Sequence, residues 1–152
     1  MNHREAGEPA VREATDRLLT AGRLGDLDTL SPMLGNLIAG VSAQRRLLRP
    51  VLGQLVATVV SGLERERAEG SPGWHTVELL DDRDTVVGID SVRPSLRAVL
   101  RAVVAALNSE SDDARFQLGL VCTDPDPLAR LDAIAHVLAW ASDVNDVNRS
   151  ER

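Results

Sequence analysis

Residues 94–107, PSLRAVLRAVVAAL, are the segment around which the chain is organised. Apart from Ser95, Arg97 and Arg101, every side chain after Pro94 is Leu, Val or Ala. The two arginines are four residues apart, so on a helix they form one narrow polar stripe. A helix that is apolar around nearly all of its circumference belongs in a core. The sequence therefore predicts a central helix here, with neighbours on most of its sides.

Helical patterns also occupy the chain on both sides of this segment. Apolar residues at helical spacing predict a first helix over 9–22, which ends at a glycine. The next pattern runs over 31–67, and Pro50 interrupts it without any accompanying loop residues. A kinked helix is favoured over a sharp corner at this proline, which removes one backbone donor. A last helix is predicted over 128–142, after an Asp-Pro start signal.

Residues 74–92 predict a β-hairpin, and a Gly-Ser-Pro-Gly break precedes them. Valine and threonine are frequent in this stretch, and a run of aspartates in its middle supplies turn chemistry. If Asp82 and Arg83 form a two-residue loop, the resulting register places His75 opposite Asp90. An isolated hairpin is marginal in water, so this one needs packing against the helices or a third strand.

The predicted fold class is therefore mainly α, a helical bundle with one β-hairpin inserted between the N-terminal and C-terminal helices. Residues 114–122 are ambiguous, and a helix is favoured because Gly119 weakens a strand. The alternative is an α+β fold with a third strand near 115–122. One domain is expected over 1–152, with disordered tails at 1–8 and 145–152.

The composition limits the partners and the cellular location that we expect for the chain. The net charge is −6, and residues 71–152 carry 8 arginines against 14 acidic residues, which disfavours binding to nucleic acid. No apolar run reaches the roughly 20 residues that span a bilayer, so no membrane association and a cytoplasmic location are expected. Cys122 stands alone, which excludes an internal disulfide and indicates a small buried residue. All 17 basic residues are arginine, which indicates a GC-rich coding sequence and a bacterial source.

Four polar residues are candidates for a ligand pocket between the hairpin and the last helix. His136 follows Asp132 by four residues, so the two side chains share a helix face. His75 and Asp90 face each other in the predicted hairpin, but no nucleophile motif accompanies them. One histidine and one carboxylate are too few for a metal site. Structural ion pairs are the favoured interpretation of both pairs, and no metal or cofactor is predicted.

Self-association is predicted from the apolar helices. The segments 51–63, 94–107 and 128–141 are each apolar over most of their circumference, and a chain of this length is expected to bury only one such helix fully. A two-fold homodimer would join two such faces into one core. The interface candidates are Gly53, Ala57, Val60, Leu96, Val103 and Trp140.

The function predicted from these features is that of a non-enzymatic helical interaction protein, such as a regulator, adaptor or assembly subunit. It would act through an apolar helix surface, on a second copy of itself or on another protein. The alternative is a small cofactor-independent enzyme or ligand-binding protein that uses the pocket between the hairpin and the last helix.

Overall fold

The computed structural model describes residues 7–39, 43–66, 79–80 and 83–150. These residues form a mainly α fold with a two-stranded antiparallel hairpin between the third and fourth helices, which confirms the predicted class. The elements in chain order are α1 (Gly7–Leu24), α2 (Leu27–Ile38), the 3-10 helix η1 (Ala43–Leu47), α3 (Leu48–Glu66), β1 (Leu79–Leu80), β2 (Val86–Val87), the 3-10 helix η2 (Ile89–Ser91), α4 (Pro94–Leu107), α5 (Ser111–Thr123) and α6 (Pro127–Ser150).

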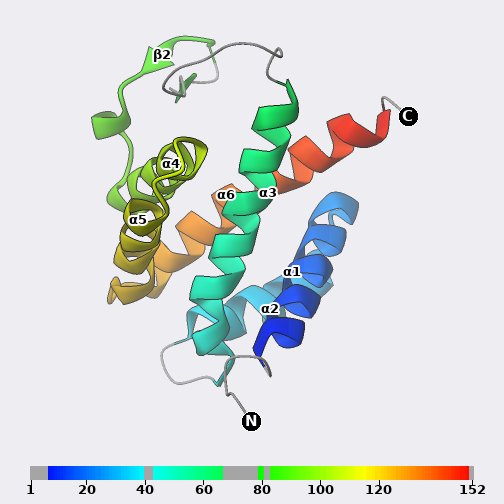
Figure 1. Cartoon of the computed structure of the whole chain (residues 1–152). Helices are drawn as coiled ribbons and strands as arrows, with labels where there is room; N and C mark the ends of the chain where they lie inside the picture. Colours follow the sequence, from blue (N-terminus) through cyan, green and yellow to red (C-terminus); the bar gives the residue numbers. More distant parts are fainter. Residues whose placement is uncertain (1–6, 40–42, 67–78, 81–82, 151–152) are drawn as a thin grey trace.

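The helices are arranged around α3 and α6. Figure 1 shows α3 between the α4–α5 pair and the α1–α2 pair, with α6 crossing behind it. Both α3 and α6 contact α1, α4 and α5 as well as each other. Leu48, Val51, Leu52 and Leu55 on α3 have no solvent exposure, because neighbouring helices cover that face. The core therefore lies along the crossing of these two helices.

The helix α4 is buried as its sequence predicts. Eight of its 14 residues are buried, and Arg101 is exposed on the polar side. Val99 and Ala102 of α4 have no exposure in a single copy of the chain, and neither do Ile134 and Val137 of α6. The helices α3, α4 and α6 bury one another, so a single subunit does bury residues of all three, and the expectation that it could bury only one such helix is wrong. The homodimer stays a prediction that needs other support.

The region around Pro50 differs from the expected kinked helix. The second helix ends at Ile38, and η1 separates it from α3. Pro50 is the third residue of α3, where the backbone N–H that a proline lacks has no intrahelical partner in any case. A proline at this position starts a helix and does not bend one. The second helix also begins earlier than predicted, at Leu27, because the side chain of Asp26 caps it.

Residues 114–122 are helical, as the favoured prediction has it, and the third strand of the α+β alternative is wrong. Asp112 and Asp113 lie in the first turn of α5, where negative charge favours a helix start. The last helix is longer than its sequence suggests. It continues to Ser150, through part of the 145–152 tail for which disorder is expected. That tail contains neither glycine nor proline, so it carries no residue that stops a helix.

The hairpin has a different register from the predicted one. Leu79 pairs with Val87, and Leu80 pairs with Val86. Five residues therefore separate the paired strands in place of a two-residue loop, and Asp84 adopts a positive φ of 57° within them. A loop of this length shifts the pairing by one residue, and it changes which side chains share a face.

The stretch 44–66, which spans η1 and α3, is long and apolar enough to cross a membrane when length and composition alone are considered. The buried core helix of a globular protein has the same length and composition. The helices α1, α4, α5 and α6 contact α3, and this packing buries 39% of its most apolar window within the chain.

Candidate functional site

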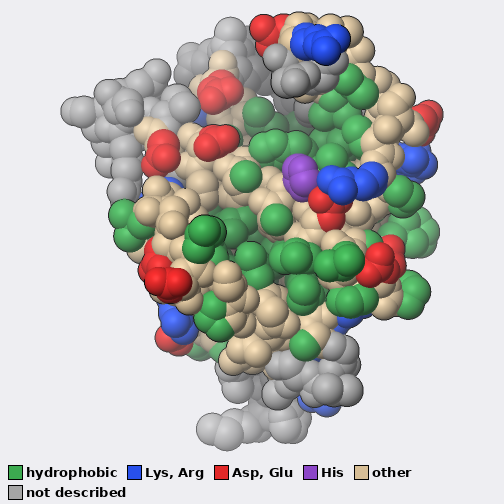
Figure 2. Space-filling view, turned by 180° about the vertical axis from the view of Figure 1, so that it is seen from behind, with side chains coloured by type: hydrophobic (Ala, Val, Ile, Leu, Met, Phe, Trp, Pro, Cys, Tyr) green, Lys and Arg blue, Asp and Glu red, His purple; other side chains and the backbone are tan. Residues whose placement is uncertain are grey.

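An apolar groove of about 320 Å³ lies between the hairpin and the helices α3, α4 and α6. Of the nine described residues that line it, eight are apolar and the ninth is Asp143. In Figure 2, hydrophobic side chains gather around a hollow near the top of the molecule. The lining residues are Val59, Leu63, Leu79, Leu80, Leu100, Val103, Trp140, Asp143 and Val144.

The walls of the groove follow from helical spacing. Val59 and Leu63 lie one turn apart on α3, and Trp140 and Val144 lie one turn apart on α6. Val59 is buried at the base of the groove, whereas Leu63 and Trp140 are half-buried along its sides. Each helix therefore buries one part of its apolar face in the core and leaves the next part open to the groove.

The hairpin supplies a ridge beside the groove. Successive side chains of a strand point to opposite faces, so Leu79 and Val87 share one face and are half-buried. Leu80 and Val86 share the other face and are 56% and 63% exposed. Leu80 also lines the groove. We call the paired Leu80 and Val86 the hairpin ridge.

The predicted pair of Asp132 and His136 lies on one face of α6. Nδ1 of His136 is 2.7 Å from the backbone carbonyl oxygen of Asp132 and 3.4 Å from Oδ1 of its carboxylate. The same carboxylate accepts hydrogen bonds from Arg93 at 2.7 Å and from the hydroxyl of Ser95 at 3.2 Å. Asp132 thereby ties the start of α4 to α6, and its oxygens are already engaged by the protein.

The predicted cross-strand pair of His75 and Asp90 does not fit the observed hairpin. Asp90 lies in η2, beyond the end of β2, and His75 lies outside the described residues. The carboxylate of Asp90 is 3.4 Å from Nη2 of Arg101. Arg97 donates to the backbone carbonyls of Asp90 and Val92, at 3.2 and 3.1 Å. The arginine stripe of α4 therefore fastens η2 to the bundle.

Sequence reasoning found the groove only in part. Asp90, Asp132 and His136 do not line it, so the structure does not bring the described ligand-pocket candidates together there. Two of the interface candidates, Val103 and Trp140, do line it. Elsewhere, Gly53, Val60 and Leu96 are half-buried and Ala57 is exposed. The sequence does show the apolar pairs one helical turn apart on α3 and α6. It does not show which part of each apolar face stays open to the groove.

The thiol of Cys122 is half-buried, and burial raises its pKa. Arg45, Arg49 and Arg130 oppose this shift because a nearby cation favours the thiolate. Arg45 also donates to the carbonyl of Cys122, at the end of α5. No cluster of three or more metal-binding side chains occurs within the part of the chain that the structure describes.

Comparison of the chain with protein-family models, with curated proteins and with solved structures gives no match. The groove, the hairpin ridge and the charges around them are therefore the observations from which a function is argued.

Proposed function

We propose that the chain is a non-enzymatic interaction protein that forms a homodimer through the apolar groove and the hairpin ridge. The observation that carries the proposal is the position of the ridge beside the groove. Leu80 is 56% exposed and lines the groove together with Val103, Trp140 and other apolar residues, and Val86, 63% exposed, is its partner across the hairpin.

A surface that carries an apolar ridge beside an apolar groove can pair with the same surface on a second copy of the chain. In a two-fold dimer the same patch of both subunits meets, so that the ridge of each copy enters the groove of the other. Burying one exposed leucine or valine side chain contributes about 1.5–3 kcal/mol, and two ridges contribute twice. Trp140 supplies the aromatic surface that is enriched at the centres of interfaces.

Electrostatics are compatible with this arrangement. Asp143 is the one charged residue among the described lining side chains, and it is exposed. It therefore belongs at the rim of the interface, where a charge keeps its contact with water at small cost. The groove offers a single carboxylate and no nucleophile among its described lining residues, which supports binding over catalysis.

The second candidate function is the binding of a small apolar molecule in the same groove. Its position between the hairpin and α6, and its volume of about 320 Å³, favour this alternative. Both functions need the groove to be accessible, and they differ in what fills it. The mass of the protein in solution separates them.

Sedimentation velocity on the full chain tests the proposal. We expect a dimer at about 100 μM, and we expect Leu80→Glu to raise the dimer dissociation constant about tenfold or more. The matched control is Leu128→Glu, which places the same charge at a leucine that is 69% exposed in the first turn of α6. This control should leave the dimer intact.

A monomeric mass for the unsubstituted chain would overturn the homodimer, and so would equal dissociation constants for the two variants. If the monomer then binds dodecanoate, and Leu80→Glu weakens that binding while Leu128→Glu does not, the ligand-binding alternative replaces the homodimer. Circular dichroism of each variant verifies that the helices are retained.

A further inference from the structure

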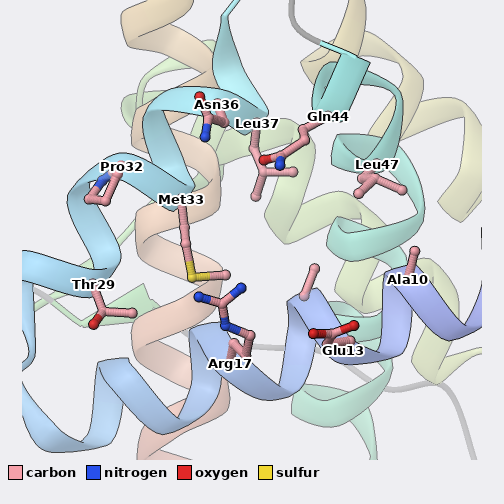
Figure 3. A pocket seen from close by; sticks show the side chains of 11 residues that line it. Ala10, Glu13, Arg17, Thr29, Pro32, Met33, Asn36, Leu37, Gln44 and Leu47 are labelled. Atoms are coloured by element: carbon pink, nitrogen blue, oxygen red, sulfur yellow. The ribbon is translucent and has the colours of Figure 1, made fainter.

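A second cavity, of about 490 Å³, lies between α1 and α2 at the opposite part of the fold from the hairpin. One face of each helix lines it, and η1 closes one end, as Figure 3 shows. We call it the α1–α2 cleft. Its lining residues are Ala10, Glu13, Ala14 and Arg17 from α1, Thr29, Pro32, Met33, Asn36 and Leu37 from α2, and Gln44 and Leu47 from η1.

The base of the cleft is apolar. Leu37 is only 2% exposed, and Met33, Leu47 and Ala14 are half-buried around it. Polar side chains occupy the rim, where Glu13, Arg17 and Asn36 are exposed. Six of the eleven lining residues are apolar and five are polar or charged, so the cleft offers both an apolar surface and polar partners to a small molecule.

The two charged residues on the rim do not neutralise each other. A glutamate four residues before an arginine on a helix has the spacing of a favourable ion pair. Among the described residues, however, the side chains of Glu13 and Arg17 form no ion pair and no hydrogen bond. In Figure 3, Arg17 extends from α1 toward Met33 of α2, and the carboxylate of Glu13 lies further along the same cleft. A cation and an anion are thus presented separately to one cavity.

We infer that the α1–α2 cleft binds a small zwitterion with an aliphatic side chain, of the class of the free aliphatic amino acids. The guanidinium of Arg17 would bind the carboxylate of the ligand, since that pairing is charge-assisted and can be bidentate. Glu13 would accept hydrogen bonds from the ammonium group. The aliphatic side chain would lie on the base formed by Leu37, Met33 and Leu47.

A zwitterion with an aliphatic side chain offers a partner to Arg17, to Glu13 and to the apolar base at the same time. A simple carboxylate would leave Glu13 without a partner, and a simple amine would leave Arg17 without one. A zwitterion without an aliphatic side chain would leave the apolar base uncovered. Binding is therefore expected to need both charges and the side chain together.

Isothermal titration calorimetry with L-leucine as the probe tests the inference on the full chain. We expect saturable binding, with a dissociation constant that rises about tenfold or more in Arg17→Ala and in Glu13→Ala. The control is Arg12→Ala, which removes an exposed arginine of α1 that does not line the cleft. It should bind L-leucine as tightly as the unsubstituted chain.

Three related probes complete the test. We expect 4-methylpentanoate, 3-methylbutylamine and glycine each to bind at least about tenfold more weakly than L-leucine. No heat of binding for L-leucine at millimolar concentration would overturn the inference. Equal affinities for L-leucine in the Arg17→Ala and Arg12→Ala variants would also overturn it. These readouts are independent of the mass of the protein, so failure here is distinct from failure of the proposed homodimer.

Discussion

Arg130 of α6 donates from Nε to the backbone carbonyl of Ile38, the last residue of α2, at 3.2 Å. Nη1 of the same guanidinium donates to the carbonyl of Asp124, directly after α5. The side chain is only 6% exposed. Because the last carbonyls of a helix lack intrahelical partners, this buried cation caps the C-terminal ends of two helices at once.

Replacing Arg130 with methionine should destabilise the protein more than any substitution of an exposed arginine. The carbonyls of Ile38 and Asp124 would lose a charged donor, and each such hydrogen bond contributes about 1.5–3 kcal/mol. We expect urea denaturation to show a loss of about 2–4 kcal/mol for Arg130→Met. Arg93→Met is the control, because its ion pair with Asp132 lies at an exposed arginine and contributes about 1 kcal/mol or less. Similar losses for the two variants would contradict the double-cap role.

Gly62→Ala should be destabilising, because α3 and α6 are in close contact at this glycine. A β-carbon at position 62 would lie 2.8 Å from Cβ of Val144 and nearer still to one of its methyl groups. Overpacking of this kind costs about 1–3 kcal/mol, against roughly 1 kcal/mol that alanine gains over glycine in a helix, so we expect a net loss of up to about 2 kcal/mol. Gly53→Ala in the same helix meets no atom within 4 Å, so it should raise stability by about 0.5–1 kcal/mol. We expect thermal denaturation to give a lower melting temperature for Gly62→Ala and a higher one for Gly53→Ala.

Asp26 should stabilise α2 in a pH-dependent way. The hydroxyl of Thr29 donates to its carboxylate at 2.6 Å and the backbone N–H of Thr29 donates at 3.1 Å, and these bonds lower the pKa of Asp26. A lowered folded-state pKa gives stability that is present above the unfolded-state pKa and is lost as the pH falls through the folded value. Asp26→Ala should therefore lower the urea midpoint at pH 7, and its difference from the unsubstituted chain should shrink in strong acid. Asp28→Ala removes a carboxylate from the same turn but keeps both bonds to Thr29, so a pH-dependent loss of equal size there would rule out the cap.

Cys122 should react slowly with iodoacetamide in the folded protein. The thiolate is the reactive form, and burial raises the pKa of this thiol above its ordinary value. At pH 8 we expect the rate of alkylation to be well below that of the same chain in 8 M urea, which mass spectrometry can follow. Equal rates in the two solutions would mean that the half-buried position does not protect the thiol.

The fold class could be predicted from the sequence because its main signals are local. The apolar circumference of 94–107 and the start signal at Asp126 and Pro127 depend on neighbouring residues alone, and both elements form. The predicted start of α2 at residue 31 is wrong because Ser31 and Pro32 have the residue types of a helix start, whereas the cap is formed by Asp26, which the sequence also allows as the cap of a short separate turn. A local pattern allows more than one start, and the hydrogen bonds decide between them.

The groove was harder to predict because it depends on contacts between distant parts of the chain. The register of the hairpin, which puts Leu80 and Val86 on one face, follows from a loop length that the run of aspartates does not fix. The mutual burial of α3, α4 and α6 within one subunit likewise cannot be judged from their separate compositions. Val103 and Trp140 could be selected as apolar surface, but their meeting at one groove needed the three-dimensional arrangement.

Intermolecular nuclear Overhauser effects in a mixture of labelled and unlabelled copies test the proposed homodimer most directly. If the homodimer forms as proposed, we expect contacts from the methyl groups of Leu80 and Val86 in one copy to the indole of Trp140 in the other. A mixture that gives no contacts between copies at millimolar concentration would contradict it, and so would contacts confined to α1 and α2.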